Sequence, residues 1–145
     1  MHAYSWVVTD IQTGQAVPTA IEMTAACLSM EAILDAPGQE RVGWYVIGGR
    51  WSQKLAPGLA DNTPLPHDMQ NKWWTDVPGN VTVVRHLDPD ERGWPADIFT
   101  PTERLHLMSH VYDIFRPPDP AKITAARELL TRYPDHIIMA VDIHD

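Results

Sequence analysis

The sequence contains a single cysteine, Cys27, so the chain cannot form an internal disulfide and nothing in it indicates an oxidising compartment. No apolar run approaches the roughly 20 residues that a membrane-spanning helix needs. Residues 1–6 lack the basic and apolar regions of a secretory signal peptide. These absences predict a cytoplasmic protein that has no membrane partner.

Basic residues are also few, because 11 Lys and Arg stand against 19 Asp and Glu, which gives a formal net charge of −8. Binding to a nucleic-acid backbone depends on clustered Lys and Arg, so we expect no such binding. The apolar fraction of 44% is typical of globular proteins. With 145 residues, the chain is long enough to bury a core without disulfides. We therefore expect a single domain over residues 1–145.

Proline is unevenly distributed, since seven of the 13 prolines lie within residues 57–101. Proline fixes φ and removes a backbone donor. This stretch is therefore expected to contain loops and short strands, and we interpret it as an irregular, proline-rich insertion.

Periodic apolar patterns lie on either side of this insertion. Residues 4–11 alternate as a strand does, and residues 20–36 place four apolar side chains on one face of a helix. The other predicted elements are strands over residues 44–48, 81–84 and 137–143 and a helix that follows Asp119 and ends at Pro134. This order predicts an α+β fold, a ferredoxin-like sheet of two split β-α-β halves with the helices on one face.

Two adjacent glycines, Gly48 and Gly49, end one predicted strand and precede Arg50 and Trp51. Consecutive N–H groups in a glycine turn can bind an anion, and Arg50 would add a charged donor. Trp44 and Trp51 could stack on a planar ligand such as a base. The alternative is a glycine bulge that bends the sheet. The motif matches neither a dinucleotide fingerprint nor a P-loop.

A second candidate site consists of His106, His110, Asp142 and His144. Spacing of i, i+4 would place His106 and His110 on one helical face, and Asp142 and His144 share one face of a strand. Three imidazoles and a carboxylate suit zinc or another divalent metal that activates a water molecule. The alternative is that these are partly exposed histidines paired with carboxylates. We expect no other cofactor.

Other catalytic signatures are absent. The sequence contains no Gly-x-Ser-x-Gly elbow and no pair of His-x-Ser/Thr tripeptides. The sequence thus leaves open whether the protein is an enzyme.

The segment Trp44-Tyr45-Val46-Ile47-Gly48-Gly49-Arg50-Trp51-Ser52 resembles the signature of a group of small uncharacterised proteins encoded mainly by bacteriophages and by actinobacteria. Phe99-Thr100-Pro101 with His106, and the ending Val141-Asp142-Ile143-His144, are similar to later segments of that group. The resemblance implies a phage-type accessory binding protein in the host cytoplasm. Such a protein captures a small anionic, nucleotide-like ligand or a host protein.

Two alternatives belong to other classes. One is a metal-dependent hydrolase that uses His106, His110, Asp142 and His144. The other is an assembly protein that forms a homodimer along an exposed sheet edge.

Overall fold

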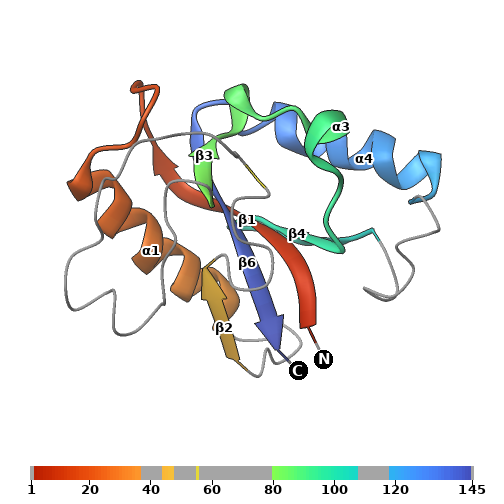
Figure 1. Ribbon diagram of the computed structural model, residues 1–145, viewed down its shortest axis with the longest axis horizontal. Helices are drawn as coiled ribbons and strands as arrows, with labels where there is room; N and C mark the ends of the chain where they lie inside the picture. Colours follow the sequence, from red (N-terminus) through yellow and green to blue (C-terminus); the bar gives the residue numbers. More distant parts are fainter. Residues whose placement is uncertain (1, 37–43, 48–54, 56–79, 108–117, 145) are drawn as a thin grey trace.

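The computed structural model describes residues 2–36, 44–47, 55, 80–107 and 118–144. Within them, six strands form one mixed sheet (Figure 1). Its order is β2-β6-β1-β4-β5, and β3 pairs with β6 on the same edge as β2. The strands are β1 (His2–Gln12), β2 (Trp44–Ile47), β3 (Val81–Val83), β4 (Asp97–Phe99), β5 (Arg104–His106) and β6 (His136–His144).

The strand β6 lies at the centre of the sheet and is buried from residue 137 to residue 143. It runs antiparallel to β1, β2 and β3, while β1 runs parallel to β4. Ile137, Met139 and Val141 contribute to one core cluster, and Ile138 and Ala140 contribute to the other. Because successive side chains of a strand point to opposite faces, each face of the sheet requires its own apolar cover.

The helix α1 (Ala20–Leu34) covers one of these faces. It begins with a capping box, in which Thr19 Oγ1 accepts from the backbone N–H of Glu22 and Glu22 Oε1 accepts from that of Thr19. The predicted apolar stripe is confirmed, because all four of its members are buried: Met23, Cys27, Met30 and Leu34. They pack with Val7, Phe99 and Met139 of the sheet.

The helix α4 (Pro120–Thr131) covers the opposite face. Asp119 caps it by accepting from the backbone N–H of Ala121, as the sequence predicts. Its buried residues Leu129 and Leu130 pack with Trp6.

The α+β class and the mixed sheet are confirmed and agree with a ferredoxin-like type of fold. The expectation that the helices share one face is corrected, since α1 and α4 pack on opposite faces. The reason is that β1 and β6 are apolar on both faces. Among the described residues, no helix is long and apolar enough to cross a membrane.

Part of the predicted insertion belongs to this sheet. Residues 57–79 lie outside the described residues, whereas residues 80–101 supply β3, β4, the 3₁₀ turn η3 (Val84–His86) and the short helix α3 (Pro89–Arg92). The helix ends at Gly93, whose φ of 83° is a conformation that favours glycine.

The buried thiol of Cys27 provides a first test of the core. Burial raises the pKa of this thiol from 9.0 to about 12, so at pH 8 the folded chain holds about a thousand times less thiolate than the unfolded chain. We expect native Cys27 to react with a disulfide reagent at least about a hundredfold more slowly than in denaturant. Equal reaction rates in the native and the denatured chain would contradict this packing. A Cys27→Ala variant, which has no thiol, measures the background signal of the reagent.

Candidate functional site

The candidate residues of the glycine turn lie mainly outside the part of the chain that the structure describes. Gly48, Gly49, Arg50 and Trp51 are all outside it. Trp44 is the first residue of β2 and lies opposite His144 of β6 in the sheet register. The anion-binding turn therefore stays a prediction.

The histidine set is divided by the sheet. His106 ends β5, so its backbone is a strand and not a helix, and His110 lies outside the described residues. Asp142 lies opposite Tyr4 in the register and on the same face, the face that α4 covers. His106 lies opposite Asp97, on the face that α1 covers. The described residues contain no group of three or more His, Cys, Asp or Glu that could hold a metal ion.

His106 instead belongs to a cluster with Asp97 and Arg104, which we name the β5 cluster. His106 Nδ1 lies 2.6 Å from Asp97 Oδ1, and Arg104 Nε donates to the same oxygen at 3.2 Å. The alternation of the β4–β5 hairpin places all three side chains on one face. The sequence alternative of a histidine paired with a carboxylate is therefore confirmed for His106.

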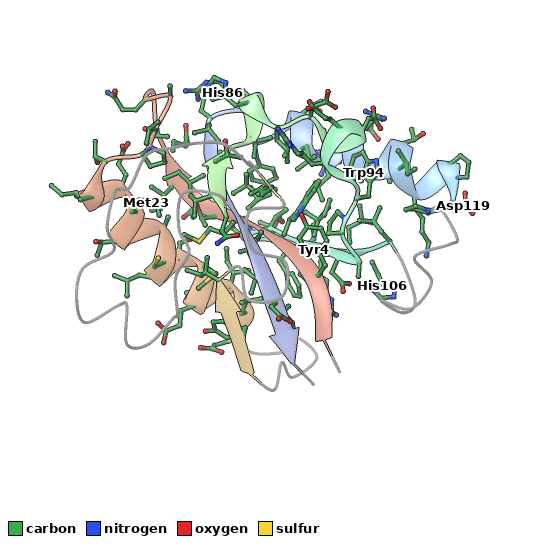
Figure 2. All side chains as sticks on the ribbon, viewed as in Figure 1. Tyr4, Met23, His86, Trp94, His106 and Asp119 are labelled. Carbon is green, nitrogen blue, oxygen red and sulfur yellow. The ribbon has the colours of Figure 1, made fainter. Side chains whose placement is uncertain are left out.

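Burial within the β5 cluster is uneven. The side chain of Asp97 is 4% exposed, whereas those of Arg104 and His106 are 30% and 52% exposed. The Arg104 guanidinium also lies 4.8 Å from the centre of the Phe99 ring. A carboxylate accepts and does not donate, so Nδ1 carries a proton, and in the neutral ring the lone pair is on Nε2. Figure 2 shows His106 at the right of the view, far from Met23 of α1.

A groove of about 400 Å³ lies between α4 and the η3–α3 segment, and we name it the α4 groove. Its lining is mainly apolar, with two arginines and one threonine: Val84, Arg85, Leu87, Pro89, Arg127, Leu130, Thr131 and Pro134. Arg127, Leu130 and Thr131 have the i, i+3, i+4 spacing of one helix face. The elements that form it lie at the top of Figure 1.

Arg85 of the α4 groove is held mostly by uncharged acceptors. Its Nη1 donates to the carbonyl oxygen of Thr13 and to Asp135, each at 3.1 Å. Its Nη2 donates to the carbonyl oxygen of Gln15 at 3.1 Å. Carbonyl oxygens fix the guanidinium without cancelling its charge.

Arg127 is held by one carboxylate and one ring. Its Nη2 donates to both carboxylate oxygens of Asp90, and its guanidinium lies 5.4 Å from the centre of the Trp94 ring. The hydrogen bond from Arg127 lowers the pKa of Asp90, and the same bond raises the pKa of Arg127. Both groups are exposed, so this ion pair contributes little to stability.

Sequence reasoning did not identify the α4 groove or Asp97. Arg85 and Arg127 are far apart in the chain, and only the packing of η3 beside α4 brings them to one groove. No protein-family model matches the chain, and the comparisons with curated proteins and with solved structures gave no significant match.

Proposed function

We propose that the protein binds a small apolar anion, a carboxylate or phosphate on an aliphatic or aromatic body, in the α4 groove. One observation carries the proposal: two separately anchored arginines, Arg85 and Arg127, line one apolar groove in a chain whose net charge is −8. This proposal retains the anionic ligand that the sequence predicts and gives it a second candidate location besides Arg50.

The dimensions and the charges of the groove support a ligand of this kind. Pockets for small molecules span roughly 300–1,000 Å³ and combine an apolar lining with a few polar groups. Leu87, Leu130 and Pro134 would contact the apolar body. The partners of the two arginines, Asp90 and Asp135, are exposed, and exposed ion pairs contribute only about 0–1 kcal/mol. An incoming anion can therefore replace Asp90 and Asp135 as the partner of the two arginines at a small cost in free energy.

Calorimetric titration with decanoate, decanol and AMP tests the proposal. We expect decanoate or AMP to bind and decanol to bind at least about tenfold more weakly, because it lacks the charge. Arg85→Gln and Arg127→Gln should each weaken binding by about tenfold, and Thr131→Trp should block the groove. The matched control is Lys122→Gln, which removes an exposed cation of α4 that does not line the groove.

Three outcomes would contradict the α4 groove as the site. These are no binding of either anion, equal binding of decanol, and anion binding that survives all three groove substitutions. Anion binding that Arg50→Ala abolishes, while the groove variants leave it intact, would favour the turn at residues 48–51. A phage-type role and a host-protein partner are supported only by the resemblance described above, in residues 44–52, 99–101 with His106, and 141–144.

A further inference from the structure

The imidazole of His106 is held in a form suited to nucleophilic attack. Its Nδ1–H donates to the buried carboxylate of Asp97, so in the neutral ring the lone pair is on Nε2, on the side of the ring away from that bond. The side chain is 52% exposed, so a solute can reach it. The ring is thus oriented by a fixed partner on one side and accessible on the other.

The other histidines with described side chains lack this arrangement. The side chain of His86 is exposed and contacts no described carboxylate. His136 Nδ1 lies 2.8 Å from the carbonyl oxygen of Thr9, and its ring packs edge-on against Tyr133. A carbonyl oxygen orients a ring but carries no net charge to stabilise an imidazolium. Among the histidines with described side chains, His106 alone has such a charge beside it, from Asp97.

A cation lies on the same side of the sheet. Arg104 is two residues before His106 on β5, so both side chains project from the same face. The Arg104 guanidinium is anchored on Asp97 and on the Phe99 ring. Arginine is well suited to the oxygens of a phosphoryl group because its planar fork presents several donors.

We infer that His106 is a phosphoryl-accepting histidine, that Nε2 is the acceptor atom and that Asp97 is its positioning residue. This inference is independent of the α4 groove, which lies on the other face of the sheet. With phosphoramidate as donor, in the form whose nitrogen is protonated as –NH3⁺, the Nε2 lone pair attacks phosphorus, the N–P bond of the donor breaks and ammonia leaves. The imidazole gains one positive charge and keeps its Nδ1 proton, so the charge forms beside the Asp97 carboxylate. Arg104 would neutralise charge on the phosphoryl oxygens.

The experiment incubates the folded protein with potassium phosphoramidate and follows phosphohistidine by ³¹P NMR and intact mass. We expect one dominant product that His106→Gln removes and that the matched controls His86→Gln and His136→Gln leave unchanged. Asp97→Asn should slow its formation by about tenfold or more, because an amide neither fixes the tautomer nor stabilises the imidazolium. Arg104→Lys should retain more of the rate than Arg104→Leu.

A separate measurement keeps the inference testable if Asp97→Asn does not fold. In the wild type, ¹⁵N chemical shifts should report His106 as the Nδ1–H tautomer, unlike the unanchored His86. Phosphorylation spread evenly over the exposed histidines, no phosphorylation of His106, or a His106 ring that exchanges tautomers freely would each overturn the inference. The β5 cluster would then be a structural tie between β4 and β5.

Discussion

Replacing Trp6 with alanine is expected to lower the free energy of unfolding by about 3–5 kcal/mol. The indole is fully buried and packs against the rings of Tyr4 and Trp94, whose centres lie 6.3 Å and 5.8 Å from its own. Its Nε1 donates to the Tyr4 hydroxyl at 2.8 Å. The substitution therefore leaves a large cavity and removes a hydrogen-bond donor inside the core beneath α4. Urea denaturation followed by far-UV circular dichroism measures the loss.

The matched control is an apolar side chain that the structure leaves in solvent. Ile21 of α1 is 83% exposed, so Ile21→Ala should change the free energy of unfolding by less than about 0.5 kcal/mol. A loss for Trp6→Ala that is no larger than the loss for Ile21→Ala would contradict the packing of the α4 face.

Removing both hydrogen-bond donors from Asp97 is the second change from which we expect a large loss of stability. Arg104→Leu combined with His106→Leu retains apolar cover but leaves the buried carboxylate without its two donors. An uncompensated buried charge costs several kcal/mol, and we expect a loss of about 3 kcal/mol. Urea denaturation again provides the measurement.

Replacing the unpaired Asp97 carboxylate by a neutral amide should restore part of the free energy of unfolding that the double variant loses. The triple variant, in which Asp97→Asn is added to the two leucine substitutions, is expected to be more stable than the double variant, because an amide is cheaper to bury than an ion. A triple variant that is equally unstable would show that Arg104 and His106 stabilise the hairpin through packing and not through the carboxylate of Asp97. The comparison needs no ligand, so it is independent of any binding function.

The long periodic segments were predictable because local physics determines them. The capping box at Thr19, the stripe that contains Met23 and Met30, and the cap at Asp119 each act within a few residues. The strand β6 was predictable because a run of apolar residues can be buried on both faces of a sheet.

The placement of the helices was not predictable in the same way. An apolar stripe shows that a helix is buried on one side, but it does not show which face of a sheet will receive it. Which face a helix covers depends on the path that the chain takes between strands that are distant in sequence. The three-residue strands β4 and β5 are also too short to show a period, and Pro95 and Pro101 on either side of β4 indicated loops.

The candidate sites, too, were predictable where they depend on local sequence and not where they depend on long-range packing. His106 was identified from its residue type, but it lies in a strand, so the helical spacing that would place His106 and His110 on one face does not apply at His106. Its partner Asp97 was missed because hairpin register, and not proximity in sequence, brings the two together. The α4 groove had no sequence signal, because it exists only where η3 packs beside α4.

The position of β6 has a consequence for how the protein is made. This strand pairs with β1, β2 and β3, so it joins β2 and β3 to the part of the sheet formed by β1, β4 and β5. Contacts between distant parts of a chain form slowly, since a long loop must close before any pairing is gained. On the ribosome, β1 can pair with β4 first, but the edge of β1 that pairs with β6 stays open until residues 136–144 have left the exit tunnel. The sheet thus closes only after residues 136–144 have been made, and before that point the nascent chain has open strand edges that can aggregate.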